Sequence, residues 1–512
     1  MNSLESVDNE KFDAPVIGHF IDGQEVAGEG RMSDVFNPAR GVVSKKVALA
    51  GADIYETAVV ACKNAFPAWR NTPSQKRAQI MFRFKQLLEE NADDICALIT
   101  DEHGKVLDDA RGELTRGIEV VEYACGISEL LKGQFSKNAG PDIDSWSEFQ
   151  PLGIVAGITP FNFPAMVPMW MFPLAIACGN TFILKPSERD PSAPILIARL
   201  LSEAGLPNGV FNVVNGDKET VDLILQDERI QAVSFVGSTP IAEAIYKKGT
   251  SSGKRVQALG GAKNHAVIMP DADIDNAVNA LMGAAYGSCG ERCMAISVAV
   301  CVGEEISNKV VASLKDRIKK LRIGPGTDTT NDMGPLITQE AYTRIHSYVE
   351  EGLNQGAELV ADGRNLEVPG YDNGFFVGGF LFDKVTREMS IYTDEIFGPV
   401  LCVVRVKNLD EAMALINEHE YGNGTCVFTR DGETARYFTD NIQVGMVGVN
   451  VALPVPVASQ SFGGWKRSLF GDLYVYGPDA IRFYTRRKTM TQRWPADNKT
   501  EKIKFAFPSG GT

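Results

Sequence analysis

The stretch from Pro151 to Leu184 restricts the possible folds most strongly, because it contains no charged residue. A segment of this length without charge must be buried, either in a protein core or in a membrane. Four prolines interrupt it, at positions 160, 164, 168 and 173, and proline breaks or kinks a helix. We therefore predict a buried strand, a turn and a helix here, and no membrane span.

The residues that follow alternate between short apolar runs and amphipathic runs, which is typical of βαβ units in a parallel sheet. We predict a doubly wound α/β fold, in which ligands bind at the carboxyl ends of strands and phosphates lie at helix N-termini. The predicted strands are Leu152–Ile158, Thr181–Leu184, Val210–Val214 and Ala232–Val236, and the predicted helices follow Pro164 and cover Pro194–Ala204, Thr220–Leu225 and Ile241–Lys248.

At 512 residues the chain exceeds the size of a single core, so we expect more than one domain. Helical spacing predicts an early helical region, and a second alternation after Asp271 predicts a second α/β domain. The early helices are Ile54–Phe66, Gln75–Asn91 and Val106–Leu131, and the later elements are helix Ile274–Ala285, strand Val298–Val302, helices Glu305–Leu321 and Gln339–Asn354, and apolar runs at Val400–Val406 and Gly445–Asn450.

Charge and cysteine content restrict the partners and the compartment. A formal net charge of −14 argues against a nucleic-acid partner or an anionic membrane surface. Nine cysteines without a Cys-x-x-Cys pair indicate a reducing compartment. Met1 to Lys11 is acidic and has no apolar segment, so we expect a cytoplasmic protein. The five histidines show no metal-ligand spacing, so we expect no metal site.

The turn Gly290-Glu291-Arg292-Cys293-Met294-Ala295 has the composition of a nucleophilic site. The guanidinium of Arg292 is expected to favour the thiolate of Cys293, and small neighbours leave room for a substrate carbonyl. The alternative is a small buried apolar residue, which is the commoner role of a lone cysteine.

Four motifs in order resemble those of the aldehyde dehydrogenase superfamily: Pro160-Phe161-Asn162-Phe163-Pro164, Lys185-Pro186-Ser187-Glu188, the turn at Cys293, and Asp394-Glu395-Ile396-Phe397-Gly398-Pro399. Phe161, the segment Gly261-Ala262-Lys263-Asn264-His265 and the cysteine turn are similar to the CoA-acylating methylmalonate-semialdehyde dehydrogenase branch. The resemblance covers nearly the whole chain.

This resemblance implies three parts for the fold. A doubly wound NAD-binding domain would comprise residues 1–135 and 151–270, and an α/β catalytic domain would comprise residues 271–480. A small β-flap, formed near Ser136–Gln150 and Ile481–Gln492, would join subunits into a homodimer or homotetramer. As domain boundaries we assign residues 136–150 and 481–512 to the oligomerisation flap together with the C-terminal tail.

The resemblance also implies roles for single residues. Cys293 would attack the aldehyde, while Asn162 and the Cys293 backbone N–H stabilise the oxyanion. Alternatively, Asn162 only closes a turn between prolines. Phe161, Lys185, Glu188, Ser238 and Glu395 would bind NAD.

Some of these cofactor assignments also have ordinary structural readings. Lys185 and Glu188 follow a strand, where a carboxylate can accept the ribose hydroxyls, but they are also readable as a solvated pair. Glu395 is alternatively an exposed acid beside Asp394. Ala242 replaces a glycine that the family usually has after Ser238. For His265 we expect a hydrogen-bonded core residue and no catalytic role. For Trp170 and Met171 we expect side chains that pack a helix against the core and do not line a pocket.

Substrate and acyl acceptor are inferred from two further features. Arg116 and Arg292 are expected to hold a substrate carboxylate, because the planar guanidinium pairs with it through two hydrogen bonds; Arg116 is otherwise a helix-surface residue. The segment from Gln257 to Ala262 lacks the glutamate that activates water in hydrolytic members, which favours coenzyme A as acyl acceptor. Glu291, two residues from Cys293, could substitute for that base, or its side chain could equally face solvent.

We therefore expect CoA-acylating oxidation of methylmalonate or malonate semialdehyde, with propanoyl-CoA or acetyl-CoA as the product. One alternative is a hydrolytic, NAD-dependent aldehyde dehydrogenase. The other is a catalytically silent NAD-binding protein that kept the fold.

Overall fold

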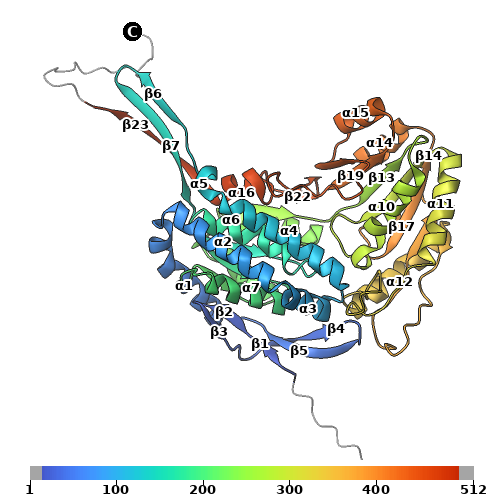
Figure 1. The fold of residues 1–512 in the computed structure, drawn as a ribbon, viewed down its shortest axis with the longest axis horizontal. Coiled ribbons are helices and arrows are strands. Elements are labelled where there is room, and N and C mark those ends of the chain that lie inside the picture. Colours follow the sequence, from blue (N-terminus) through green and yellow to red (C-terminus); the bar gives the residue numbers. More distant parts are fainter. Residues whose placement is uncertain (1–13, 495–512) are drawn as a thin grey trace, which may run out of the picture.

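The computed structural model describes residues 14–494, so the expectations for Met1–Lys11 and for the tail after residue 494 lie outside the described residues. An eight-stranded sheet forms the first half of the molecule (Figure 1). Its five central strands are parallel and its outer strands are antiparallel. The order is β22 (Leu469–Phe470), β12 (Arg255–Leu259), β11 (Ile230–Val236), β8 (Ile154–Ile158), β9 (Thr181–Lys185), β10 (Phe211–Val213), β2 (His19–Ile21) and β3 (Gln24–Val26).

This strand order confirms the doubly wound prediction. The chain runs outward from β8 through β9 to β10, then returns to the other side of β8 with β11 and β12. The order therefore reverses between β8 and β11, and in open α/β sheets the ligand crevice lies at such a reversal.

Helices cover both faces of this sheet. On one face α2 (Ser74–Glu90), α3 (Ala92–His103), α4 (Leu107–Cys125), α5 (Ile127–Leu130), α6 (Met166–Ala177), α7 (Ser192–Glu203) and α16 (Gly477–Tyr484) share one core. On the other face α1 (Ala52–Arg70), α8 (Lys218–Gln226) and α9 (Thr239–Ser251) share a second.

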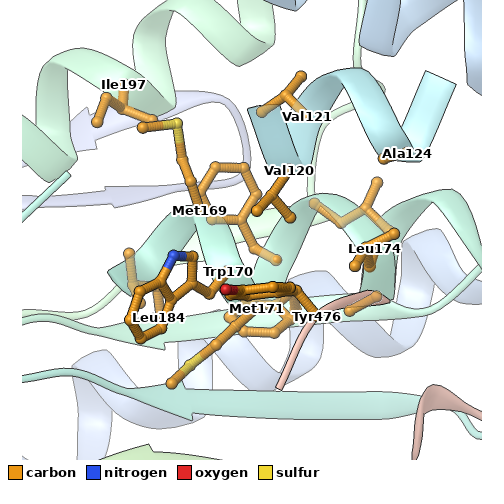
Figure 2. Close-up of a cluster of buried hydrophobic side chains, with 14 of the residues drawn as sticks. Val120, Val121, Ala124, Met169, Trp170, Met171, Leu174, Leu184, Ile197 and Tyr476 are labelled. Carbon is orange, nitrogen blue, oxygen red and sulfur yellow. The ribbon is translucent and has the colours of Figure 1, made fainter. Parts of the chain in front are cut away.

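The charge-free segment folds as its composition requires. It supplies β8, α6 and β9, and every residue of α6 is buried, as expected for a helix that is apolar on all sides. Trp170 and Met171 pack inside this core (Figure 2), with the Trp170 ring 5.5 Å from that of Tyr476. Their assignment to helix packing is confirmed.

The N-terminal region departs from the expected run of helices. It also contains a three-stranded sheet of β1 (Val16–Ile17), β5 (Val42–Ala48) and β4 (Met32–Asn37). The single helix expected over Val106–Leu131 is two helices, because the chain breaks at Gly126 between α4 and α5. The separate helix α3 was not predicted.

A seven-stranded sheet forms the second half (Figure 1) and is parallel except for β15. Its order is β15 (Glu358–Ala361), β16 (Phe380–Asp383), β17 (Val400–Val406), β14 (Ile296–Val302), β13 (Asn264–Ile268), β19 (Gly424–Phe428) and β20 (Met446–Val449). Its helices include α10 (Ile274–Tyr286), α11 (Glu304–Ile318), α12 (Gln339–Asn354), α13 (Ser390–Thr393), α14 (Leu409–Glu418) and α15 (Gly432–Asn441).

Two segments lie in a different sheet from the one that the expected boundaries imply. Strand β13 belongs to the second sheet, although residues up to 270 were assigned to the first domain. Strand β22 pairs with β12 of the first sheet, although it lies within residues 271–480. Pairing partners far away in the sequence decide both placements, and strand patterns do not reveal them.

A three-stranded antiparallel sheet extends away from the body (Figure 1). It consists of β6 (Phe135–Gly140), β7 (Ile143–Pro151) and β23 (Thr485–Arg493). Residues 481–484, expected in the flap, are instead the end of α16. The role of this sheet in joining subunits stays a prediction. Within residues 14–494, no helix is both long enough and apolar enough to cross a membrane.

Candidate active site

A cavity of about 310 Å³ lies at the reversal of strand order in the first sheet. Loops after β8, β9, β11 and β12 form one wall, and residues from the half that contains the second sheet form the other. The lining comprises Pro160, Phe161, Asn162, Arg189, Val236, Gly237, Ser238, Gly260, Gly261, Cys293, Ala341, Arg344, Glu395 and Phe397. Five of the residues predicted from sequence, Phe161, Asn162, Ser238, Cys293 and Glu395, therefore line one cavity.

Cys293 lies in the loop between the 3-10 turn η1 (Gly287–Gly290) and β14. It is the one cysteine of nine that is not fully buried, and all nine thiols are free. Before it, Ser288 and Cys289 both have φ of 52°, a left-handed conformation that costs non-glycine residues free energy and persists only when neighbouring structure holds it.

The surroundings of Cys293 do not favour its thiolate in this state. Enclosure by protein and the nearby Glu395 raise the pKa of the thiol to about 12, against backbone N–H groups and Arg292, which lower it. The guanidinium of Arg292 lies 2.5 Å from Asp109, so most of its charge is compensated. The expected activation of Cys293 by the adjacent cation is therefore too weak to make the thiolate the resting form.

Asn162 is 3% exposed and lies in the loop between β8 and α6. A fully buried ion pair holds this loop in place. It joins Lys105 and Glu113 at 2.6 Å, and neither residue belongs to the Pro160–Pro164 motif. The Lys105 ammonium donates to the Asn162 carbonyl at 2.5 Å, and Glu113 accepts from the N–H groups of Ala165 and Met166 at 2.8 and 3.1 Å. The loop is thus fixed at both ends before any ligand binds.

The expected ribose-binding pair lies beside this loop. Lys185 ends β9 and is the register partner of Ile158 on β8, and its ammonium lies 3.1 Å from the carboxylate of Glu188. The Glu188 side chain is 35% exposed. Both residues lie at the carboxyl end of the strand next to the cavity, although neither lines it.

Helix α9 presents its N-terminus to the same cavity. Ser238 is its N-cap residue, but the Ser238 side chain does not cap the helix. Because the first N–H groups of a helix lack intrahelical partners, this end suits an anionic group. Glu395 lies across the cavity, accepts from the Ala262 N–H at 3.0 Å, and has a pKa raised to about 7, mainly by burial.

Neither of the two arginines expected to hold a carboxylate is among the residues that line the cavity. Arg116, on α4, donates to Glu119 at 2.6 Å and to the Pro456 carbonyl at 2.5 Å. Arg292 is bound to Asp109, also on α4. The Tyr476 hydroxyl, which donates to Pro456, lies near enough to Arg116 and Cys293 for both to affect its pKa.

Glu291 faces the interior, whereas the sequence left a solvent-facing side chain equally open. It is fully buried, accepts from the Ile337 N–H at 3.3 Å, and has a pKa raised by burial to about 8. It is not among the residues that line the cavity. His265, 3.1 Å from the Tyr392 hydroxyl, is a hydrogen-bonded core residue.

Sequence reasoning missed several site residues. Arg189 and Arg344 line the cavity, and Lys105 and Glu113 hold the Asn162 loop. A lysine and a glutamate eight positions apart usually indicate solvated charges, so the sequence carried no signal for this buried pair. Between residues 14 and 494, no cluster of histidine, cysteine and acidic residues is arranged to hold a metal ion.

Comparison with known proteins identifies close relatives. Residues 26–490 match the model of the aldehyde dehydrogenase family. The malonate-semialdehyde dehydrogenase of Pseudomonas aeruginosa is 67% identical over 491 residues, which is 96% of this chain and 99% of that protein. Malonate-semialdehyde dehydrogenase 3 of Geobacillus kaustophilus is 50% identical over 93% of this chain and 98% of that protein.

Solved structures agree with this relationship. The crystal structure of methylmalonate-semialdehyde dehydrogenase from Oceanimonas doudoroffii superposes with a TM-score of 0.93 at 64% identity, covering 94% of this chain and 99% of that chain. A proposed methylmalonate-semialdehyde dehydrogenase from Sinorhizobium meliloti, solved with NAD, has a TM-score of 0.94 at 57% identity, covering 95% and 99%. This chain belongs to the aldehyde dehydrogenase family.

Proposed function

We propose that this protein oxidises malonate semialdehyde or methylmalonate semialdehyde with NAD and transfers the acyl group to coenzyme A. The observation that carries the enzymatic part is that Cys293, Asn162 and Glu395 line one cavity. The relatives with these substrate names, at up to 67% identity, support the substrate class. A catalytically silent protein would have no need to retain all three groups in one cavity.

The residues around the cavity fit NAD. The uncapped N-terminus of α9 and the Ser238 hydroxyl suit the pyrophosphate, and the Glu188 carboxylate beside Lys185 suits ribose hydroxyls. We assign Glu395 to the nicotinamide ribose and Phe161 to the cavity wall near it. NAD would supply the acceptor for the hydride that leaves the substrate.

The chain's own residues would carry the remaining chemistry. After the Cys293 thiol loses its proton to solvent, Sγ attacks the aldehyde carbon and the carbonyl π bond breaks. The carbonyl oxygen becomes an oxyanion that the Asn162 amide and the Cys293 N–H would stabilise. Loss of hydride leaves a thioester on Cys293. For these substrates the carboxylate leaves as carbon dioxide before transfer, and the resulting thioester enolate takes up a proton from solvent. Coenzyme A then displaces the Cys293 sulfur, so the product is acetyl-CoA or propanoyl-CoA.

Coenzyme A rather than water would release the acyl group, because the segment Gln257–Ala262 offers no carboxylate. The Gln257 amide is itself occupied, since it accepts from Ser234 at 2.8 Å and donates to the Leu473 carbonyl at 2.8 Å. Water without a base is a poor nucleophile, whereas a thiol is already a few per cent thiolate at neutral pH.

This proposal is tested by pre-steady-state measurement of NADH. Without coenzyme A, NADH should form in one burst stoichiometric with Cys293 and then nearly stop, and added coenzyme A should restore turnover. Rapid turnover in water alone would instead establish the hydrolytic alternative. A complete lack of NADH formation with either semialdehyde would favour the non-enzymatic one.

We expect kcat/KM to be more than about tenfold higher for NAD than for NADP, since like charges brought together cost several kcal/mol. Glu188 would repel a 2′-phosphate, although Lys185 and partial exposure weaken the effect. Glu188→Gln should lower the ratio of kcat/KM for NAD to kcat/KM for NADP. Glu203→Gln, which replaces an exposed acid on α7, should leave this ratio unchanged. Equal kcat/KM values for both cofactors in the unmodified protein would refute this placement of Glu188.

Substrate recognition by Arg116 and Arg292 predicts a selective effect on KM. Replacing either with glutamine should raise KM for the semialdehyde by about tenfold or more, because a charged hydrogen bond contributes about 1.5–3 kcal/mol. The KM for propanal, which has no carboxylate, should change much less. Comparable effects on both aldehydes would remove the carboxylate role.

Two controls isolate the carboxylate contact. Arg111→Gln alters an exposed arginine on the same helix, bound to Asp93, and should leave both KM values unchanged. Asp109→Asn removes the partner of Arg292 and keeps the guanidinium, so it separates loss of the ion pair from loss of the cation.

We also propose a cytoplasmic homodimer or homotetramer. The nine free thiols support a reducing compartment. The sheet of β6, β7 and β23 supports assembly, because it extends away from the body (Figure 1) and a small sheet is stabilised by packing against another element, here a second subunit.

A further inference from the structure

Two asparagine side chains hold the backbone carbonyl of the proposed nucleophile. Asn264, the first residue of β13, donates through Nδ2 to the carbonyls of Cys293 and Ala295, both at 2.9 Å. Asn423, which precedes β19, donates through Nδ2 to the same Cys293 carbonyl at 3.1 Å. The asparagines are 2% and 5% exposed, so water competes little for these bonds.

The orientation of the Asn264 amide is fixed by a third contact. Its Oδ1 accepts from the backbone N–H of Gly424 at 2.9 Å. A backbone N–H can only donate, so the atom facing it must be the oxygen, and Nδ2 must face Cys293. Asn264 thereby connects β13, the cysteine loop and the start of β19 through one side chain.

Holding this carbonyl also fixes the next N–H. The peptide bond between Cys293 and Met294 is trans, so its C=O and N–H point in opposite directions within one rigid plane. The backbone N–H groups of Cys293 and Met294 lie near enough to the thiol to lower its pKa. Rotation of this plane would withdraw the Met294 N–H from the sulfur.

The loop needs such an anchor because the backbone that precedes Cys293 is strained. Ser288 and Cys289 adopt φ of 52°, and a Cβ at Gly290 would lie 2.2 Å from the Gly398 carbonyl oxygen. The chain therefore enters the cysteine turn in an unfavourable conformation that tight packing maintains. The two asparagines hold it where it leaves the turn.

We propose that Asn264 and Asn423 are positioning residues for Cys293, which together fix the orientation of the Cys293–Met294 peptide beside the Cys293 sulfur through its carbonyl oxygen. This inference rests on the proposed role of Cys293 as nucleophile. It assigns a function to two amides that belong to neither the cofactor contacts nor the oxyanion contacts described above.

The test measures the reactivity of Cys293 without aldehyde, NAD or coenzyme A. Asn264→Leu and Asn423→Leu keep the side-chain volume and remove the donors. Alkylation of Cys293 by iodoacetamide, followed by mass spectrometry of the Cys293 peptide, should be about three- to tenfold slower at each pH from about 6 to 9. Asn264→Leu, which loses more hydrogen bonds, should have the larger effect.

A spectroscopic readout separates thiolate loss from altered access of the reagent. The ultraviolet absorbance of the thiolate, taken as the difference from Cys293→Ala, should titrate at higher pH in both variants. Other charged or titratable groups facing Cys293 are Glu395, Arg292 and Tyr476, and they are unchanged in all variants. Because both amides act through one peptide, the double variant should be less affected than the sum of the single variants.

Asn180→Leu is the matched control. Asn180 is fully buried and makes four hydrogen bonds to backbone, with Leu152, Gly153, Ala175 and Tyr484. Its loss should lower thermal stability without changing the alkylation rate or the thiolate titration.

Folded Asn264 or Asn423 variants with an unchanged thiolate titration would overturn the inference, as would an equal shift in Asn180→Leu. If the leucine variants do not fold, Asn423→Ser serves in their place. Failure of the protein to oxidise semialdehydes would contradict the proposed function and leave this thiol measurement intact.

Discussion

Replacing Cys293 with alanine is expected to reduce NADH formation by on the order of 10⁵-fold, because no other group can form the covalent intermediate. NAD binding should be nearly unchanged, since the proposed dinucleotide contacts come from Lys185, Glu188 and Ser238. The first quantity is measured as a single-turnover rate with semialdehyde and coenzyme A. The second is measured by fluorescence titration with NAD.

Cys289→Ala is the matched control for this result. Cys289 lies in the 3-10 turn η1, just before the loop of Cys293, and is buried. Burial raises the pKa of its thiol well above the usual range. The variant should keep most of the NADH-forming activity. Retention of activity in Cys293→Ala together with its loss in Cys289→Ala would transfer the nucleophilic role to Cys289.

Replacing Asn162 with alanine is expected to lower kcat by about 10²–10³-fold, the usual effect of removing one donor to an oxyanion. The oxyanion exists only after attack, so KM for the semialdehyde should change much less. Asn162→Asp has the same shape without the amide donors and should be at least as impaired. Steady-state kinetics with saturating NAD and coenzyme A measure both quantities.

Asn180→Ala controls for the loss of a buried amide, because Asn180 lies away from the cavity lining. It should leave kcat close to that of the unmodified protein. A rise of KM together with the fall in kcat in Asn162→Ala, or an unchanged kcat, would show that Asn162 only closes its turn. The Lys105–Glu113 pair, which holds the same loop, predicts that this turn persists without the Asn162 amide.

The cavity joins two halves of the molecule that have separate cores. The loops after β8, β9, β11 and β12 approach it from the first sheet, while Cys293, Ala341, Arg344, Glu395 and Phe397 approach it from the second. The proposed nucleophile from one half thus faces the proposed oxyanion donor and the proposed Ser238 cofactor contact from the other. The segment from Gly260 to Asn264 runs between the halves and contacts Glu395 through Ala262 and Cys293 through Asn264.

The sequence by itself determined the doubly wound sheet, because strand and helix periodicity are local patterns and the charge-free segment could only be buried. It also determined which residues were chemically suited to the site, since motifs at Asn162, Cys293 and Glu395 supply an amide, a thiol and a carboxylate. The structure brings all three to one cavity.

Only the tertiary structure decided the electrostatic state of the site. Burial and the nearby Glu395 raise the pKa of the Cys293 thiol to about 12. Arg292 adjoins Cys293 in sequence, but it is paired with Asp109, 183 residues away, and does not offset this rise. From sequence the Glu291 side chain could equally face solvent, whereas in the structure it is fully buried. Strand β13 was assigned to the first half and pairs in the second sheet. Each outcome depends on contacts between distant residues, and neither periodicity nor motif spacing contains that information.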